Sequence, residues 1–237
     1  MKNAPARRTA EPPRTSRARQ SSAVRTRLGS EVRLVLAGHR PGDRPSPARP
    51  RAAVLGRSNV GKSSLLNALL GVGVARVSST PGRTQALYWY RVDGAFDLVD
   101  CPGYGWARTS QGSRELFAGL IEELLTASPR PELALLLVDS RLTPQESDRS
   151  MALFLSNAGV PTVLVATKWD DVKPSRRAAR LRELSAEYEA PDRPILPVST
   201  RTGESLPRLA ALVRERLALP TPRRGPAAPT TPSPEVP

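Results

Sequence analysis

The chain has 237 residues, with 36 Lys and Arg against 22 Asp and Glu, a net charge of +14, one His and one Cys. A single Cys excludes a disulfide framework and a cysteine-bound zinc site, and a single His excludes a His-rich metal centre and argues against a Ser-His-Asp hydrolase. Because no apolar run approaches the about 18 residues of a membrane span, these features indicate one ordinary domain in a reducing compartment, with no membrane segment.

The first 30 residues are predicted to be a disordered basic arm. Residues 1–51 hold 13 basic and three acidic residues, a net charge of +10. The arm has no apolar period, so it buries too little surface to offset the entropy of ordering. Three interpretations stay open: a solubilising segment, a nucleic-acid-binding segment and an Arg-rich transit peptide. Residues 220–237 hold seven prolines and are predicted to be a disordered tail.

Residues 31–219 alternate between strand and helix patterns. Asp93-Gly94 is a hairpin turn signal, and the continuous apolar runs at 133–138 and 162–166 are typical of parallel strands covered on both faces. The pattern predicts an α/β sheet flanked by helices, with one early antiparallel hairpin. Strands are expected at 32–37, 52–55, 85–92, 95–99, 133–138, 162–166 and 195–198, and helices at 62–70, 113–126, 144–157, 174–189 and 205–217.

The segment 56–63 has the pattern G-x-x-x-x-G-K-[ST] of a phosphate-binding loop, between an apolar strand and a helix. Its glycines let backbone N–H groups curl around phosphate oxygens, and the N-terminus of the following helix adds a positive end. We expect Lys62 to reach the β- and γ-phosphates and the Ser63 hydroxyl to bind Mg²⁺. The expected phosphate-binding residues are Gly56, Arg57, Ser58, Asn59, Val60, Gly61, Lys62 and Ser63.

A second motif follows the strand expected at 95–99. A carboxylate at the tip of that strand, beside a phosphate loop, is placed to hold Mg²⁺ through water, and a glycine N–H can face the γ-phosphate. A purely structural D-x-P-G turn is the alternative interpretation. The residues concerned are Asp100, Cys101, Pro102 and Gly103.

Two further motifs, each after a predicted strand, indicate which nucleotide base the site would recognise. A carboxylate at Asp170 can accept hydrogen bonds from N1–H and the 2-amino group of guanine, which adenine cannot supply, so it predicts GTP over ATP. Backbone and hydroxyl groups of the second motif can touch guanine O6. The residues are Thr167, Lys168, Trp169 and Asp170 in the first motif, and Val198, Ser199 and Thr200 in the second.

In this order and spacing the motifs resemble those of the small GTPases, and closely those of the EngB (YihA/YsxC) ribosome-biogenesis GTPases. The resemblance rests on GRSNVGKSS at 56–64, TPGRTQ at 80–85, DCPGYGW at 100–106 and TKWD at 167–170. It implies a P-loop GTPase (Ras-like) three-layer fold, with a mostly parallel six-stranded sheet and one antiparallel hairpin strand. It also implies a first switch with Thr84 as a Mg²⁺ ligand, and nucleotide contacts from Gly82, Arg83, Thr84, Gln85 and Ala86.

The functional expectation that follows is a bacterial cytoplasmic GTPase that uses Mg²⁺ and acts in assembly of the large (50S) ribosomal subunit. The resemblance further implies a need for it in normal cell division and septation. We expect a monomer, since the chain has no heptad pattern, and partners in the 50S subunit or its precursors, to which the basic arm would add salt-sensitive attraction. Two alternatives stay open: another small GTPase of the superfamily, and a GDP/GTP-sensing RNA-binding scaffold with little hydrolysis.

The expected catalytic residues are Lys62, Thr84 and Tyr104. Tyr104 stands where many GTPases carry a Gln that orients the attacking water, and a phenol cannot offer that amide, so we expect slow intrinsic hydrolysis. Asn59 matches the position used by K⁺-stimulated GTPases, so K⁺ or the ribosome is expected to accelerate turnover; a simple turn residue is the alternative. Cys101 stands where the family usually has Leu and is expected to make the site sensitive to thiol reagents.

Three consecutive aromatic residues and one separate tryptophan allow two interpretations each. Tyr88, Trp89 and Tyr90 could stack on RNA bases, but residues at strand spacing more often pack within a sheet. Trp106 lies beside the second switch and could contact a partner in the GTP state. We expect sheet packing for the first three residues.

Overall fold

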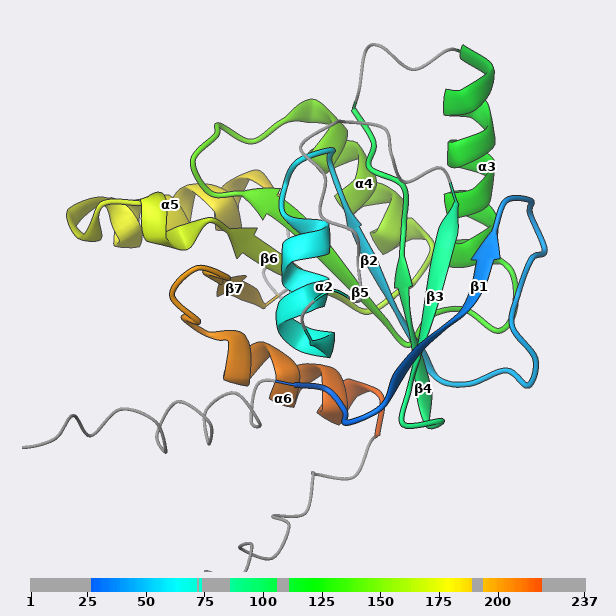
Figure 1. The fold of residues 1–237 in the computed structure, drawn as a ribbon. Coiled ribbons are helices and arrows are strands. Elements are labelled where there is room, and N and C mark those ends of the chain that lie inside the picture. The colour runs from blue at the N-terminus through cyan, green and yellow to red at the C-terminus, as the bar shows by residue number, and fades with distance from the viewer. Residues whose placement is uncertain (1–26, 72, 74–85, 106–110, 189–193, 219–237) are drawn as a thin grey trace, which may run out of the picture.

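The computed structural model describes residues 27–71, 73, 86–105, 111–188 and 194–218. Within them, a seven-stranded sheet has the strand order β1-β3-β4-β2-β5-β6-β7 and carries helices on both faces (Figure 1). The elements are β1 (Val32–Gly38), β2 (Arg51–Gly56), α2 (Lys62–Leu70), β3 (Leu87–Val92), β4 (Phe96–Asp100), α3 (Gln111–Thr126), β5 (Leu133–Asp139), α4 (Glu146–Asn157), β6 (Thr162–Thr167), the 3₁₀ turn η1 (Trp169–Asp171), α5 (Pro174–Glu187), β7 (Ile195–Pro197) and α6 (Leu206–Arg216).

The sheet is mostly parallel, and β3 is its one strand of opposite direction. β3 pairs antiparallel with both β1 and β4, while the other neighbouring strands pair in parallel. The predicted α/β architecture and the hairpin are confirmed. The predicted count of six strands is wrong by one, because the segment Val32–Gly38 pairs with the outer edge of β3 and becomes a seventh strand.

The core lies on both faces of the sheet because successive side chains of the central strands point to opposite sides. In β2, Ala52 and Val54 belong to the cluster beneath α2 and α6, while Ala53 and Leu55 belong to the cluster beneath α3, α4 and α5. The same alternation holds along β5. Helix, sheet and helix therefore form three layers, and the continuous apolar runs in the sequence correspond to strands covered on both faces.

The parallel strands bring the functional motifs to one edge of the sheet. Gly56, Asp100, Asp139 and Thr167 are the last residues of β2, β4, β5 and β6 respectively. Neighbouring parallel strands have their carboxyl ends at the same edge of the sheet, and ligands of open α/β sheets bind just outside these ends. The segments after these strands are therefore neighbours although they lie far apart in the sequence.

The domain begins before residue 31, the boundary expected from the sequence. Leu28 is buried in the cluster beneath α2 and α6, and its N–H donates to the carbonyl of Leu69 over 2.7 Å. The N–H groups of Ser30 and Glu31 both donate to Oδ1 of Asp93 at the hairpin turn. Residues 27–30 therefore pack on the domain, and the predicted arm and tail otherwise lie outside the described residues.

The aromatic residues of β3 support the sheet. Trp89 and Tyr90 are 1% and 5% exposed, so the expectation of sheet packing is confirmed for these two, and half-buried Tyr88 packs against the cluster that contains Tyr90. Trp106 lies outside the described residues. None of the helices in the described ranges has the length and apolar character of a membrane-crossing segment.

Candidate functional site

The phosphate loop connects the end of β2 to the start of α2. Gly61 has φ +111°, a backbone conformation that residues with a side chain rarely adopt, so glycine is required there. Its carbonyl accepts the first helical hydrogen bond, from the Leu65 N–H over 2.9 Å. The first N–H groups of α2 have no partners within the helix, and they turn toward the loop as donors for an anion.

Lys62 lies beneath this loop and contacts its backbone. Its side-chain Nζ donates to the carbonyls of Gly56 over 2.9 Å and Arg57 over 3.0 Å, and the residue is 8% exposed. Burial lowers the pKa of the Lys62 ammonium, and the nearby Asp100 carboxylate partly offsets that effect. The ammonium is thus held as a compact charge at the point where the loop turns back on itself.

The segment after β4 lies directly against the phosphate loop. A side chain at Gly103 would place its Cβ 2.8 Å from Ser58 Oγ and 2.9 Å from Lys62 Nζ, so only glycine fits. The Ser58 N–H donates to the Tyr104 carbonyl over 3.1 Å, and Arg57 and Tyr104 form a parallel bridge. These contacts place Gly103, the glycine expected to face the γ-phosphate, next to Lys62.

Asp100 is the last residue of β4, and one of its two carboxylate oxygens has no hydrogen-bond partner among the described residues. The residue is 3% exposed, and that oxygen is Oδ1. Burial raises the pKa of Asp100 to about 7, although the Lys62 ammonium opposes this rise. A buried oxygen without a partner is costly. This orphan oxygen fits a nearby cation or its bound water.

The oxygens available here suit Mg²⁺. Mg²⁺ prefers hard oxygen donors, keeps several waters and binds proteins through one or two side chains together with substrate phosphates. Ser63 in the first turn of α2 and Asp100 supply a hydroxyl and a carboxylate, whereas Thr84 lies outside the described residues. Across the described ranges, no three His, Cys, Asp or Glu side chains cluster as a metal site. A cation held by hydroxyls, water and phosphates would need no such cluster.

The base-side motifs meet at the ends of β6 and β7. The Trp169 N–H donates to the Val198 carbonyl over 3.2 Å, and the buried Trp169 ring lies under the guanidinium of Arg177, 5.5 Å from the ring centre. The pKa of Asp170 is lowered, chiefly by the neighbouring Ser199 and also by Arg201, which donates to Oδ2, so Asp170 is held as an ionised acceptor. The two segments are therefore joined through both backbone and side chains.

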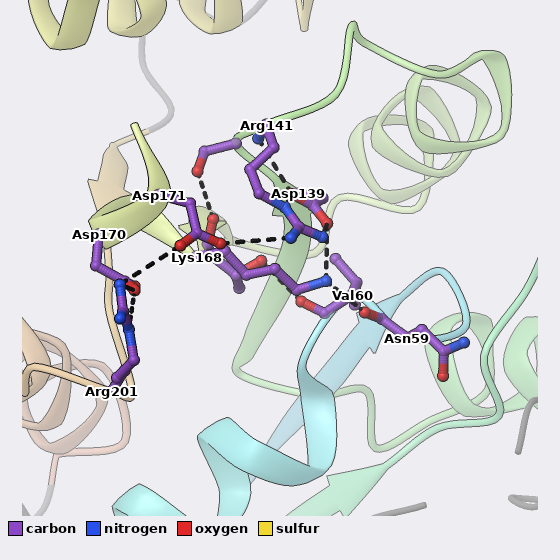
Figure 2. Close-up of polar contacts among 10 residues, drawn as sticks. Asn59, Val60, Asp139, Arg141, Lys168, Asp170, Asp171 and Arg201 are labelled. Atoms are coloured by element: carbon purple, nitrogen blue, oxygen red, sulfur yellow. Dashed lines mark hydrogen bonds and ion pairs between the residues drawn. The ribbon is translucent and has the colours of Figure 1, made fainter. Parts of the chain in front are cut away.

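A chain of ion pairs connects these motifs to the phosphate loop (Figure 2). Lys168 donates to Asp139 Oδ2 and to the Asn59 carbonyl, each over 2.8 Å. Arg141 forms a bidentate pair with Asp139, with two contacts of 2.9 Å, and reaches Asp171 over 3.3 Å. Because these partners favour its ionised form, the pKa of Asp139 is lowered despite partial burial.

Lys168 itself has a backbone conformation that supports this arrangement. Its φ of 56° is in the left-handed region, which is uncommon for residues other than glycine and is found at functional sites. Just before it, Thr167 Oγ1 donates to the Val60 carbonyl over 2.7 Å. Both residues therefore tie the base-side motif to the phosphate loop.

Most of the expected site residues are described, and they lie at one edge of the sheet. Val198 and Ser199 are buried while Thr200 is exposed, and Ala86 is fully buried just before β3. The first-switch residues Gly82 to Gln85 lie outside the described residues. Pro102 and Cys101 are buried beside Asp100.

The expectation that Cys101 makes the site sensitive to thiol reagents is wrong. The side chain is 0% exposed and belongs to the core cluster beneath α3, α4 and α5. Burial also raises the pKa of the thiol, so little of the reactive thiolate forms. In this position Cys101 acts as a small apolar residue.

Sequence reasoning missed four charged residues of this region: Asp139, Arg141, Asp148 and Arg201. Asp139 carried a signal, since it is the polar residue that ends an apolar strand, in the same way as Asp100. Asp148 carried none, because it lies inside a helix, yet it is 3% exposed and accepts the Tyr104 hydroxyl. Arg141 and Arg201 do not stand out in a sequence so rich in arginine, and only the folded structure identifies their partners.

Comparison with known proteins agrees with this geometry. A family model described as "50S ribosome-binding GTPase" matches residues 51–168. The chain is 41% identical over 184 residues to the "Probable GTP-binding protein EngB" of Thermotoga petrophila, covering 77% of this chain and 94% of the relative. It is 42% identical over 180 residues to the protein of the same name from Gemmatimonas aurantiaca, covering 76% and 88%.

Solved structures confirm the fold. A crystal structure titled as a probable GTP-binding protein EngB superposes with a TM-score of 0.62 at 24% identity, covering 71% of this chain and 98% of that one. The structure of Aquifex aeolicus Era bound to GDP and aluminium fluoride superposes with a TM-score of 0.60 at 23% identity, covering 74% and 58%. Together with the extent of the curated matches, the arrangement of Lys62, Asp100 and Asp170 at one sheet edge establishes the family. The chain belongs to the EngB family of GTP-binding proteins.

Proposed function

We propose that the protein binds GTP and GDP with Mg²⁺, hydrolyses GTP slowly, and acts as a switch in assembly of the large (50S) ribosomal subunit in the bacterial cytoplasm. The observation that carries this proposal is the close approach of Gly103 to Lys62 and Ser58, where no side chain would fit, beside the unpartnered Oδ1 of Asp100. It joins the phosphate loop and the second switch segment at one point. A γ-phosphate at that point would contact both.

The chain's own groups account for phosphate binding. Loop N–H groups and the N-terminus of α2 would donate hydrogen bonds to the anion, and Lys62 would exchange its two carbonyl partners for phosphate oxygens. Ser63 and Thr84 would hold Mg²⁺ directly and Asp100 through water, and the cation neutralises charge on the phosphates. Binding would fix Thr84 and Gly103 against the γ-phosphate, and its loss on hydrolysis would release both segments.

The choice of guanine rests on Asp170. Its ionised carboxylate, whose pKa is lowered chiefly by Ser199, can accept the N1–H and 2-amino hydrogen bonds of guanine. Adenine would leave this carboxylate without those donors, and an unpaired polar group lowers affinity strongly. We therefore infer that ATP is neither bound nor hydrolysed at useful rates.

The ribosomal role rests on family membership and on charge. The matched family model is described as a 50S ribosome-binding GTPase. The net charge of +10 within residues 1–51 favours association with rRNA, in a salt-dependent way. We infer a monomeric protein with the 50S subunit or its precursors as partner, and we infer from the family resemblance that loss of the protein disturbs cell division and septation.

One observation favours a second candidate, a GDP/GTP-sensing scaffold with little hydrolysis. The Tyr104 side chain, at the position where a water-orienting Gln is common, donates its hydroxyl to Asp148 over 3.0 Å. A side chain held toward α4 does not orient an attacking water. Turnover then depends on an activator, for which K⁺ near Asn59 and the ribosome are the candidates.

The deciding experiment measures GTP and ATP hydrolysis by the purified full-length chain, alone and with 50S subunits, in K⁺, Na⁺ and choline buffers. We expect slow GTP turnover that rises with 50S subunits, with ATP inert. Equal rates in all three buffers would remove the role of K⁺. Tight GDP binding without hydrolysis under any condition would establish the scaffold instead.

The basic arm needs its own test. A variant lacking residues 1–26, which keeps the packed segment from Arg27 onward, should bind 50S subunits more weakly, with the largest loss at low salt. Sedimentation with 50S particles at several salt concentrations measures this. Unchanged association would mean that the arm has no role in ribosome binding.

A further inference from the structure

Arg201 lies on the carboxylate that would read guanine. It follows the Ser199-Thr200 segment after β7, and its Nε donates to Oδ2 of Asp170. Its Nη2 also reaches Oδ1 of Asp171 over 3.4 Å. Figure 2 shows the guanidinium beside both carboxylates, at the end of the ion-pair chain that leads to the phosphate loop.

Guanine and Arg201 need the same acceptor. A carboxylate accepts hydrogen bonds only through its two oxygens, and guanine offers it two adjacent donors. The arginine already occupies Oδ2 of Asp170, which is one of these two oxygens. An arginine that stays on Oδ2 therefore competes with guanine for one of the two oxygens that the base needs.

The arrangement also offers Arg201 an alternative partner. The Arg201 side chain is 71% exposed, so it can swing without displacing core atoms. Asp171 is 41% exposed and is itself fixed by Arg141 over 3.3 Å. A guanidinium that leaves the Asp170 side chain, which is 10% exposed, can thus keep an ion pair with the more exposed Asp171, and Arg201 itself stays solvated in either geometry.

We propose that Arg201 is a specificity-site residue that competes with guanine for Asp170 and withdraws toward Asp171 when the base binds. This inference rests on the proposed guanine-nucleotide site. Only the fraction of molecules with Asp170 free accepts the base, so the apparent affinity falls by that fraction. The reduction acts on the association rate and leaves the dissociation rate unchanged, because the arginine no longer touches the occupied carboxylate.

The kinetic signature separates this role from two simpler ones. Removing Arg201 should accelerate association of a guanine nucleotide by about two- to fivefold, the range that an exposed ion pair supports. A general loss of positive charge near an anionic ligand would instead slow association. An arginine that contacts the bound base would, when removed, accelerate dissociation.

The experiment measures association and dissociation of mant-GDP by stopped-flow fluorescence, with the full-length chain and Arg201→Ala. The control is Arg182→Ala, which removes the same charge from an exposed position on α5 where no ion pair is found within the part of the chain described. We expect faster association only for Arg201→Ala, with unchanged dissociation in both variants. Unchanged or slower association, or faster dissociation, would overturn the inference.

A second measurement tests whether the effect passes through Asp170. In the Asp170→Asn variant, the amide oxygen is a weaker acceptor than the carboxylate and binds Arg201 less tightly. The probe for this variant is mant-XDP, because the 2-carbonyl of xanthine can accept a hydrogen bond from the Asn amide. Adding Arg201→Ala to this background should give little further acceleration. An acceleration as large as in the Asp170 protein would mean that Arg201 acts elsewhere. If the wild-type chain bound no mant-GDP at all, the proposed function itself would fail.

Discussion

The hydroxyl of Tyr104 donates a hydrogen bond of 3.0 Å to Oδ1 of Asp148, which joins the segment after β4 to the first turn of α4. Asp148 is 3% exposed, and the pKa of the Tyr104 hydroxyl is raised well above its ordinary value by burial and by this carboxylate. The same segment is tied to the phosphate loop through the Ser58 N–H and the Tyr104 carbonyl. Tyr104 therefore connects the phosphate loop with α4.

Replacing Tyr104 by Phe should separate structural from catalytic roles. Tyr104→Phe keeps the ring and removes the donor to Asp148, so we expect a loss of about 1–3 kcal/mol in the free energy of unfolding, the cost of a buried group left unsatisfied. GTP turnover should stay at the wild-type rate, because the hydroxyl faces α4. Urea unfolding and a GTPase assay measure the two effects. A large loss of turnover with unchanged stability would contradict this role.

Asp148 makes stability depend on pH. Burial raises its pKa to about 6, with the Tyr104 hydrogen bond and then the charge of Arg57 partly opposing the rise. An unfolded Asp titrates near about 3.9, so the folded chain binds the extra proton between these values, and stability falls as pH rises through this window. The ionised, buried carboxylate is destabilising above pH 6.

Asp148→Asn should therefore stabilise the protein at high pH. Asn keeps an acceptor for the Tyr104 hydroxyl but carries no charge, and we expect a gain of about 1–3 kcal/mol at pH 8 that shrinks toward zero only below about pH 4. Thermal unfolding followed by circular dichroism between about pH 3 and pH 8 covers the whole titration window and measures the difference. The exposed Glu146→Gln on the same helix controls for net charge. A constant difference at every pH would exclude titration of Asp148 as the cause.

The fold was largely predictable because its signals are local. The segments 133–138 and 163–166 are apolar at every position, as is typical of parallel strands covered on both faces, and Asp93-Gly94 marks the hairpin. Strand β1 was predicted as a strand, but its membership of the same sheet depends on pairing with β3, which lies far along the chain. The count of strands in the sheet therefore could not be read from local pattern.

In the candidate site, too, some contacts follow from local sequence and others depend on the fold. Residues within a motif, such as Lys62 or Asp170, have roles set by neighbours in the sequence. The contacts of Arg201 and Tyr104 span 31 and 44 residues, and no spacing rule relates these partners. Burial of Cys101 likewise follows from the packing of α3, α4 and α5 on the sheet, and the sequence places that residue only beside a motif.

Lys62 should be essential for nucleotide binding and dispensable for folding. Lys62→Ala removes a charged donor that would bind phosphate oxygens, so we expect GDP affinity to fall about 10–100-fold, as for hydrogen bonds to charged groups. Fluorescence titration with mant-GDP measures the affinity, and circular dichroism checks the fold. Lys173→Ala, on an exposed lysine just before α5, is the matched control and should bind normally. Equal affinity in both variants would disprove the phosphate-loop role.

Cys101 offers a direct measurement of how tightly the site is packed, because it is the one thiol in the chain. Reaction with a disulfide reagent requires an exposed thiolate, and Cys101 is fully buried with a pKa raised by burial. We expect the native protein to react only through transient opening, far more slowly than the urea-unfolded chain. Added GDP should slow the reaction further, since a ligand that binds the folded state lowers the open population. A native rate equal to that of the unfolded chain would contradict the burial, whereas protection that grows with GDP concentration would report nucleotide binding next to β4.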